Sequence, residues 1–479
     1  MACSKYMTPQ EISAYAPYKL ADDGLTPKDR ARKRMEDGGL WTEKQYMGRR
    51  WGIGCVSLEI TQRCNLDCTL CYLSESSEAL KDIPLEEVYR RIDMIRAHYG
   101  PNTDIQVSGG DPTLRKRDEL VAIVRRIREV GMRPTLFTNG IKATRDMLEE
   151  LAEAGLVDVA FHVDLTQERK GYATEEDLNE VRLEYINRAR GLPIAVYFNT
   201  TVYEGNFQEV PKIVDFFVKH SDVVRLASFQ LQADTGRGVL AERAFMITQQ
   251  SVADQIRKGA GCDINFDLAD IGHSACNKYA MTLVTDGKVS DLFDDPEYIR
   301  KVIKATEDVV IDRTNKRRAL EAVVDAVIKT PSLLPDSAAW LAKKGWKMKN
   351  DLFRSRGKVN KLSFFIHNFM DACHLEKDRI DACVFMVATA EGPLSMCLNN
   401  AKRDEYLLKP IPIRKEGVVQ FWNPVTGSFQ KDAPKKVEVV HTRKTARGRT
   451  REKIEAERLA ARAIQKAGAQ TGSQAPEKI

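Results

Sequence analysis

Three cysteines within a stretch of eight residues constrain this chain more than any other feature. Cys64, Cys68 and Cys71 have the spacing C-x3-C-x2-C, and the aromatic Tyr72 follows. Iron–sulfur clusters are normally held by four cysteines, so three on one loop leave one iron of a [4Fe–4S] cube without a protein ligand. An open coordination site indicates chemistry rather than scaffolding. A structural zinc site would need a fourth Cys or His nearby, and Cys55 is interpreted as a buried small hydrophobe.

A second segment with special backbone requirements follows the cysteines. Residues 55–61 predict a strand that runs directly into the cysteine loop, and residues 104–107 predict a second strand. The segment Ser-Gly-Gly-Asp-Pro-Thr at 108–113 comes directly after that second strand. Because glycine has no Cβ, Gly109 and Gly110 let the backbone approach a bound molecule closely.

The cysteine loop and segment 108–113 together resemble the radical S-adenosylmethionine (SAM) superfamily. In that family the open iron binds the amino and carboxylate groups of SAM, and the reduced cluster cleaves SAM to methionine and a 5′-deoxyadenosyl radical. Segment 108–113 is similar to the family's Gly-Gly-Glu-Pro segment, whose backbone holds the SAM amino group, with Asp111 in place of Glu. The resemblance also implies an electron donor of the flavodoxin or ferredoxin type.

The resemblance implies a set of site residues. Cys64, Cys68 and Cys71 would ligate the catalytic cluster, and polar groups at strand ends would contact SAM or substrate. The residues expected to bind the cofactor are Tyr72, Gly109, Gly110, Asp111, Thr113, Asn139, Asn199 and Gln230. His162 and Asp164, after the fourth predicted strand, are further candidates for which a structural role is equally reasonable.

Strand and helix patterns alternate from about residue 55 to residue 232, as a parallel α/β fold requires. Six strand–helix units predict a partial (β/α)6 TIM-type barrel, the architecture that the resemblance implies. Parallel barrels place their sites at the carboxyl ends of the strands, where the motifs above lie. The predicted strands are 55–61, 104–107, 134–138, 157–163, 194–201 and 223–232, and the predicted helices are 85–99, 117–130, 144–154, 175–190 and 207–219.

We expect five regions along the chain, with a helical insertion and a C-terminal cysteine-rich region added to the barrel. Short helices are predicted at 28–36 and 41–50, and a longer one at 241–258. The regions are an N-terminal extension (1–50), the radical SAM barrel (51–238), a mainly helical substrate or auxiliary region (239–370), a cysteine-rich auxiliary cluster region (371–436) and a basic tail (437–479).

A second group of cysteines lies toward the C-terminus. Cys373 precedes a predicted hairpin over 383–397 that has a cysteine at each end, close to the pattern of auxiliary-cluster domains on radical SAM enzymes. A [4Fe–4S] cluster there needs a fourth ligand, for which Cys276 is the first choice and Cys262 the alternative. The competing interpretation is that these are scattered free thiols, since disulfides are less expected still.

Three further segments are similar to the group that contains tetraether lipid synthase. They are residues 198–202, 228–232 and 273–276, and an Asn also follows Cys397 as that group requires. Tetraether synthases carry a cysteine-rich metal site before the barrel, whereas this chain has only Cys3 there, and the group also holds pterin-methylating enzymes.

The resemblance favours C–H activation on a lipid or other long apolar substrate, such as the joining of carbon chains. The alternative is a radical SAM enzyme or methyltransferase acting on a peptide or on a small metabolite such as a pterin. The aromatic and lysine-rich segment 333–370 could take chains from a membrane surface or form an ordinary helical core. A non-catalytic cluster protein is disfavoured by the open-site cysteine spacing.

Composition and charge bear on where in the cell the protein is located. The chain has 479 residues, 43% hydrophobic and 30% charged, and no apolar run approaches the roughly 20 residues that cross a bilayer. Ten cysteines and no signal sequence predict a reducing cytoplasm. Residues 441–479 carry ten Lys and Arg against four Asp and Glu, which equals the net charge of +6 of the whole chain. The tail is either simply solvated or contacts anionic lipid at the inner membrane face; a nucleic acid partner is not expected.

Overall fold

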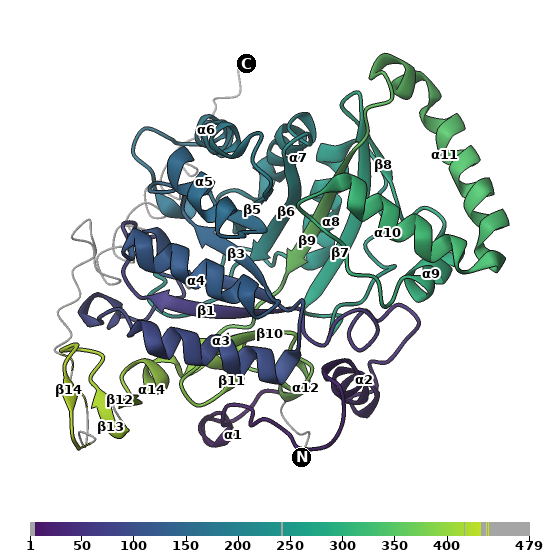
Figure 1. The fold of residues 1–479 in the computed structure, drawn as a ribbon. Coiled ribbons are helices and arrows are strands. Elements are labelled where there is room, and N and C mark those ends of the chain that lie inside the picture. The colour runs from purple at the N-terminus through teal and green to yellow at the C-terminus, as the bar shows by residue number, and fades with distance from the viewer. Residues whose placement is uncertain (1–4, 241–242, 416, 433–436, 438, 440–479) are drawn as a thin grey trace, which may run out of the picture.

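A computed structural model describes residues 5–240, 243–415, 417–432, 437 and 439. In this part of the chain, one 11-stranded sheet has the order β11-β10-β1-β2-β3-β4-β5-β6-β9-β7-β8 (Figure 1). Its six middle strands are parallel neighbours in chain order, which confirms the predicted α/β partial barrel. They are β1 (Cys55–Thr61), β2 (Asp104–Gly109), β3 (Arg133–Thr138), β4 (Asp158–His162), β5 (Ala195–Val202) and β6 (Val224–Leu231).

The apolar side chains of β1 are buried beneath the helix that follows it. In β1 the apolar Val56, Leu58 and Ile60 belong to the main core, together with Val88 and Ile92 of α3. The helices between the six strands lie along one face of the sheet (Figure 1). They are α3 (Leu85–Tyr99), α4 (Arg117–Glu129), α5 (Arg145–Glu153), α6 (Asn179–Ala189) and α7 (Val210–Lys219).

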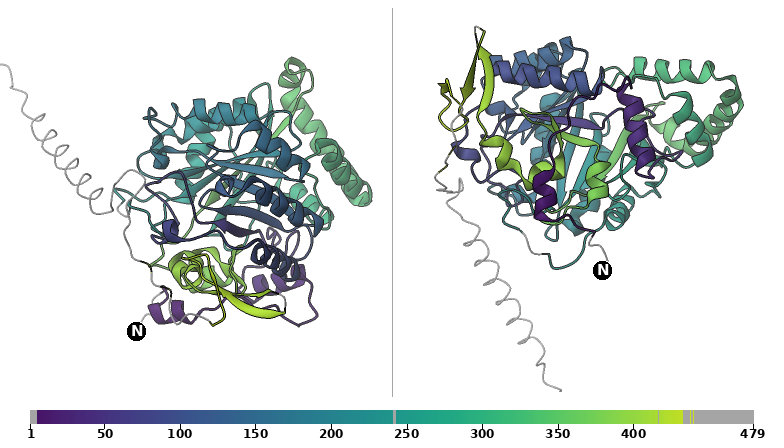
Figure 2. Two further views of the ribbon diagram at one scale, coloured as in Figure 1. Left: turned by 60° about the vertical axis from the view of Figure 1, so that its left-hand side comes forward. Right: turned by 90° about the horizontal axis from the view of Figure 1, so that it is seen from below.

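The segment between residues 239 and 370 contains strands as well as the expected helices. Strand β9 (Asn360–His367) pairs parallel with β6, and β7 (Asn277–Thr285) pairs antiparallel with β9 and β8 (Lys288–Asp291). Helices α9, α10 and α11 gather beside this edge of the sheet (Figures 1 and 2). The helices of the segment are α8 (Gln249–Ala260), α9 (Pro296–Ala305), α10 (Lys316–Ile328) and α11 (Leu334–Arg354).

The C-terminal region extends the opposite edge of the 11-stranded sheet. Strand β10 (Phe385–Ala388) pairs parallel with β1 and forms the predicted hairpin with β11 (Pro393–Ser395). The sheet therefore continues across the limits expected at residues 238 and 370, and the domain limits stay predictions. The remaining elements here are α12 (Lys377–Asp381), α13 (Met396–Ala401), α14 (Arg403–Leu407) and a separate sheet of β12 (Ile411–Lys415), β13 (Val418–Trp422) and β14 (Phe429–Gln430).

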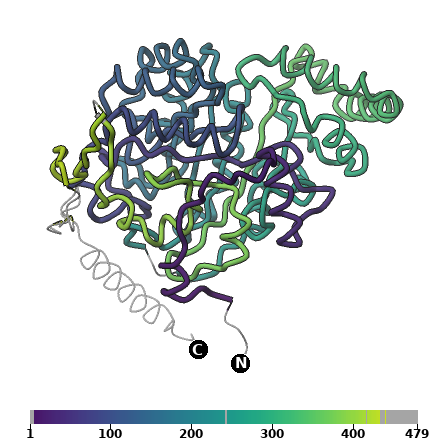
Figure 3. Tube along the Cα trace, turned by 60° about the horizontal axis from the view of Figure 1, so that its bottom comes forward, coloured from purple at the N-terminus to yellow at the C-terminus, as the bar shows by residue number. Residues whose placement is uncertain are grey.

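The N-terminal extension packs along this C-terminal region (Figure 3). The Met7 amide donates to the Leu375 carbonyl at 2.7 Å, and the extension holds α1 (Pro9–Ala14) and α2 (Pro27–Asp37). The helix predicted at 41–50 is wrong: Gly48 has a φ of +75°, and Gln45 pairs instead with the distant Asp270. The helix predicted from 241 begins only at Gln249, because Thr248 caps it there.

Cys3 and nearly all of the basic tail lie outside the described residues. Within the described part of the chain, none of the helices has the length and apolar character needed to cross a membrane.

Candidate active site

The three cysteines of the loop 62–73 lie beyond the carboxyl end of β1, where the sequence placed them. All three cysteines are partly buried. Burial raises the pKa of Cys64 to about 11, and burial together with the neighbouring Cys71 and Cys64 thiolates raises the pKa of Cys68 well above its ordinary value. Three thiolates this close repel one another, so the loop suits a positively charged metal centre, which deprotonates coordinating thiols.

Gly109 and Gly110 hold the cysteine loop by its backbone. A Cβ on Gly109, whose φ is +124°, would lie 1.9 Å from the Thr61 carbonyl oxygen, and one on Gly110 would lie 2.1 Å from the Arg63 carbonyl oxygen. The Gly110 amide donates to Thr61 at 3.0 Å and the Asp111 amide to Arg63 at 2.8 Å. The observed need for glycine is therefore the approach of this loop, and the expected approach to SAM stays a prediction.

Asp111 connects the ends of β2 and β3 from a fully buried position. Its carboxylate accepts hydrogen bonds from the Thr113 hydroxyl at 2.5 Å, the Thr138 hydroxyl at 2.9 Å and the Asn139 amide at 2.9 Å. Burial raises the pKa of Asp111, and these hydrogen bonds oppose the rise. The Asp111 and Thr113 side chains bond each other, so their main observed task is to fix the loops after β2 and β3.

Asn139, which is bound to Asp111, also contacts the cysteine loop. Its side-chain amide donates to Asn65 Oδ1 at 2.7 Å and lies 3.9 Å from Cys64 Sγ. Its backbone carbonyl accepts a hydrogen bond of 2.6 Å from Arg169, which also donates to the Tyr185 hydroxyl. Arg169 was missed from the sequence, where it sits among ordinary polar residues after β4. The result is a polar edge with one guanidinium next to the cysteine loop.

Tyr72 is held between the barrel and the C-terminal region. Its hydroxyl donates to the Gly109 carbonyl at 2.5 Å, and the Arg403 guanidinium lies over its ring at 4.8 Å from the centroid. Arg403 in turn binds the buried Glu59 with distances of 2.6 and 2.8 Å. The position expected to pack near adenine is thus fixed on several sides, and its role toward adenine stays a prediction.

The ends of β4, β5 and β6 bring the remaining candidates to the same edge. His162 Nε2 lies 2.7 Å from Asp164 Oδ2, and His162 is in register with Asn199. Burial lowers the pKa of His162, but the Asp164 carboxylate outweighs burial and the net shift is upward. Asp164 also accepts from the Thr201 amide at 2.7 Å, so part of its role is structural. Gln230, in register with Thr201, is half-buried.

A glycine-rich loop after β6, residues 233–240, contacts the cysteine loop directly. Arg237, on this loop, donates from Nε to Cys71 Sγ at 3.4 Å. Nothing in the sequence singled out this arginine. The glycines that flank it, Gly236 and Gly238, were the available signal, because they allow the two loops to lie backbone against backbone: a Cβ on Gly236 would lie 2.3 Å from the Tyr72 carbonyl oxygen.

Three cysteines of the second group come together around α12. Arg379 Nε donates to Cys276 Sγ at 3.3 Å, and the Met370 amide donates to Cys397 Sγ at 3.5 Å. Burial raises the pKa of Cys397, and the nearby Cys383 and Cys276 thiolates raise it further. Cys276 lies more than 100 residues before Cys383 in the chain, so only tertiary structure brings it to the other two.

The other two cysteines considered for this group have different surroundings. Cys373 is exposed and its sulfur lies 3.2 Å from His374 Nδ1. Cys262 lies near Asp291, Lys344 and Lys347, beside β8. Across the described residues, no set of three or more His, Cys, Asp and Glu side chains is arranged to hold a single metal ion.

Several known proteins are similar to part of this chain. A relative from Methanocaldococcus jannaschii, 7,8-dihydro-6-hydroxymethylpterin dimethyltransferase, is 30% identical over 188 residues, covering 38% of this chain and 37% of its own. PqqA peptide cyclase of Bradyrhizobium diazoefficiens is 29% identical over 179 residues, covering 36% of this chain and 46% of its own. A probable GTP 3',8-cyclase of Pyrococcus abyssi is 31% identical over 179 residues, covering 37% and 56%.

Among solved structures, Streptococcus suis SuiB bound to its precursor peptide SuiA aligns with a TM-score of 0.30 and 16% identity, covering 46% of this chain and 48% of that one. The chain thus spans between about a third and somewhat more than half of the length of the curated relatives above. The family model for the Radical SAM superfamily matches residues 58–217, which run from within β1 to within α7 and include the cysteine loop and the glycine pair. This chain therefore contains a radical SAM superfamily domain.

Proposed function

We propose that this protein is a radical SAM enzyme whose loop cysteines hold a [4Fe–4S] cluster and whose neighbouring strand ends bind SAM. The observation that carries the proposal is the placement of Cys64, Cys68 and Cys71 on one loop that Asp111 and Asn139 tie to the adjoining strand ends. When such a cluster is bound and reduced, it cleaves SAM to methionine and a 5′-deoxyadenosyl radical.

The residues of this chain supply binding and orientation. Asn139 and Arg169 form a polar edge next to Cys64, and a guanidinium there suits the carboxylate of SAM. Thr113, Asn199 and Gln230 remain proposed contacts to SAM or substrate at the same carboxyl ends. A 5′-deoxyadenosyl radical attacks many C–H bonds, so the protein must also fix the substrate and exclude water.

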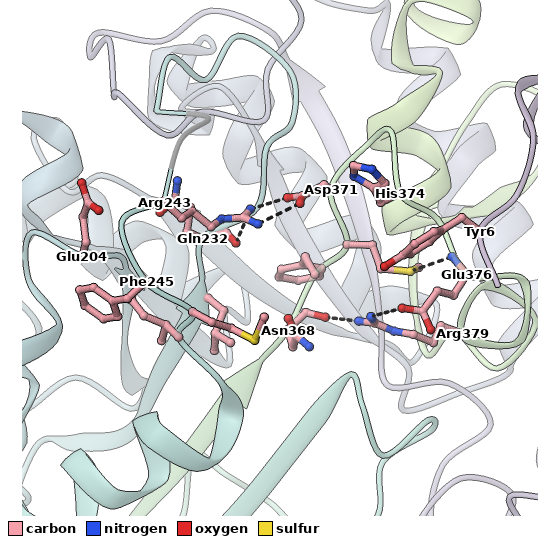
Figure 4. A pocket seen from close by; sticks show the side chains of 15 residues that line it. Tyr6, Glu204, Gln232, Arg243, Phe245, Asn368, Asp371, His374, Glu376 and Arg379 are labelled. Carbon is pink, nitrogen blue, oxygen red and sulfur yellow. Dashed lines mark hydrogen bonds and ion pairs between the residues drawn. The ribbon is translucent and has the colours of Figure 1, made fainter. Parts of the chain in front are cut away.

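A candidate pocket for that substrate lies beside the second cysteine group, next to the end of β6. Its cavity of about 180 Å³ is lined by Gln232 at the end of β6 and by Arg379, which contacts Cys276 (Figure 4). On one wall Arg243 forms an ion pair with Asp371 at 2.5 Å, and Phe245 and other apolar side chains complete the lining. Aromatic surface combined with polar groups favours a polar metabolite or a peptide segment.

We infer that the substrate is of this kind, in line with the pterin, peptide and nucleotide named for the relatives. A lipid substrate, which was the first expectation from the sequence, stays a prediction. The resemblance to the tetraether lipid synthase group also stays a prediction. The electron donor is proposed to be a flavodoxin or ferredoxin.

The proposal is tested by SAM cleavage. Anaerobically reconstituted full-length protein with dithionite and SAM is expected to form 5′-deoxyadenosine, because the open iron and the strand ends around it bind and cleave SAM even without substrate. The product is quantified by chromatography, with samples lacking dithionite as controls. Reconstituted protein that holds four irons per chain and forms none of this product would contradict the proposal.

The second cysteine group is proposed to hold an auxiliary [4Fe–4S] cluster. Cys276, Cys383 and Cys397 supply three thiolates, and Cys373 is the proposed fourth ligand, which would have to turn inward from its exposed position.

Iron content tests the auxiliary cluster. Reconstituted wild-type protein should hold about eight irons per chain, and replacing the three loop cysteines by alanine should leave about four. A triple variant that is folded by circular dichroism but nearly free of iron would show that there is no second cluster.

The basic tail is proposed to bring the enzyme to anionic membranes from the cytoplasm. Its net charge of +6 is attracted to anionic lipid by on the order of 1 kcal/mol for each Lys or Arg near the surface. Full-length protein should sediment with anionic vesicles at low salt and be released at high salt, whereas protein lacking residues 441–479 should stay in solution. Equal sedimentation of the two forms would exclude the tail as the anchor.

A further inference from the structure

The glycine-rich loop, residues 233–240, lies on the cysteine loop through main-chain contacts on both sides of Cys71. The Arg237 amide donates to the Leu73 carbonyl at 2.8 Å, and the Val239 amide donates to the Thr69 carbonyl at 2.8 Å. These contacts fix the backbone of Arg237 relative to the cysteine segment. The position of its side chain is therefore determined by the fold rather than by chance rotamer choice.

The Arg237 side chain is almost completely buried, with 3% of its surface exposed. Besides the bond from Nε to Cys71 Sγ, its Nη2 donates to the Leu66 carbonyl at 3.3 Å and its Nη1 to Glu78 at 3.2 Å. Asp67 lies 4.0 Å away. The rigid guanidinium fork thus connects the segment before Cys68 with the segment after Cys71.

Burying a cation is costly unless negative groups surround it. Burial lowers the pKa of Arg237, but the thiolates of Cys71 and Cys64 and the carboxylate of Asp67 outweigh burial and raise it. Among the residues that the structure describes, the carboxylates paired with Arg237 are Asp67, at the long distance above, and Glu78, which is half-exposed. Charge balance around Arg237 therefore depends largely on the cysteine sulfurs.

A hydrogen bond and a positive charge at a ligating sulfur act on the redox state of an iron–sulfur centre. Thiolate-ligated clusters become more negative when reduced, so a neighbouring cation stabilises the reduced state more than the oxidised one. Hydrogen bonds to the sulfurs act in the same direction.

We propose that Arg237 is a positioning residue that raises the reduction potential of the cluster held by Cys64, Cys68 and Cys71, through its charge and its bond to Cys71 Sγ. The inference rests on the proposed function. Arg237 keeps the sulfur of Cys71 in place and makes the first one-electron reduction accessible to the donor.

The test is a potentiometric titration of the reconstituted full-length protein, followed by electron paramagnetic resonance. The signal that disappears in Cys68→Ala identifies the loop cluster. Arg237→Met is expected to retain iron and to lower the equilibrium constant for one-electron reduction at least tenfold, a shift of about 59 mV. Arg237→Gln, which keeps a donor but no charge, should shift in the same direction by less, and Arg237→Lys should stay closest to wild type.

Arg63→Met is the matched control, because Arg63 belongs to the same loop but pairs with Asp82 and is half-exposed. Its potential should equal that of the wild type. If Arg237→Met loses iron, the Gln and Lys variants decide the question. The role of Arg237 alone is overturned if the Gln variant holds full iron at an unshifted potential and any Met variant that holds iron does the same. A wild-type protein without the loop cluster overturns the proposed function instead.

Discussion

Cys68→Ala is expected to reduce 5′-deoxyadenosine formation to background. Cys68 lies between the other two loop cysteines in the chain, and burial together with those two thiolates raises the pKa of its thiol. Three thiolates are the least that can hold a cube with one open iron, so two cannot keep it in place. The measurement combines iron content, which should fall by about four irons per chain, with product formation under dithionite and SAM.

Cys262→Ala is the matched control for this experiment. It removes an equally partly buried thiol, but one that lies beside Asp291 rather than at either cysteine group. It should leave iron content and product formation unchanged. Wild-type turnover in Cys68→Ala would disprove the assignment of the cysteine loop as the cluster site.

The second large effect is expected on stability from Asp111→Ala. The substitution leaves the Asn139 and Thr113 amides and two threonine hydroxyls without their shared acceptor in a fully buried place. Each buried donor left unpaired costs about 1–3 kcal/mol, and a loss of roughly 3–5 kcal/mol in the free energy of unfolding follows even if some donors find water. Anaerobic denaturant titration of the wild type and the variant measures it.

Asp22→Ala, at an exposed position of the N-terminal extension, should leave the unfolding midpoint unchanged. The Asp111 variant should also lose SAM cleavage in proportion to the disorder it introduces around Asn139 and the cysteine loop. A midpoint equal to that of the wild type would mean that the loops after β2 and β3 do not depend on this carboxylate.

The sequence predicted the features that depend on neighbouring residues. The strands β1 to β6 and helices α3 to α7 were found within a few residues because apolar periodicity is local. The cysteine spacing and the glycine pair could be recognised in the sequence for the same reason, since each is a pattern of neighbouring residues. The short stretch around Gln45 was misjudged as helical, because its partner Asp270 lies more than 200 residues away.

What the sequence could not reveal depends on distant contacts. Strands β9 and β10 were not predicted to join the sheet, since their partners β6 and β1 are far away in the chain. Arg237, Arg169 and Arg403 look like any other arginines in the sequence, and only the folded chain places them at Cys71, Asn139 and Tyr72. Convergence of Cys276, Cys383 and Cys397 was expected from the resemblance and not from spacing.

The pairing of β1 with β10 has a consequence for biosynthesis. The edge of β1 that β10 covers stays unpaired until Phe385 has left the ribosome, roughly 330 residues after Cys55. At 5–20 residues per second this delay lasts about 15–65 s, during which an apolar strand edge is open to association with other chains. The cysteine loop follows that strand, so the sheet beside it is completed only after β10 has been synthesised.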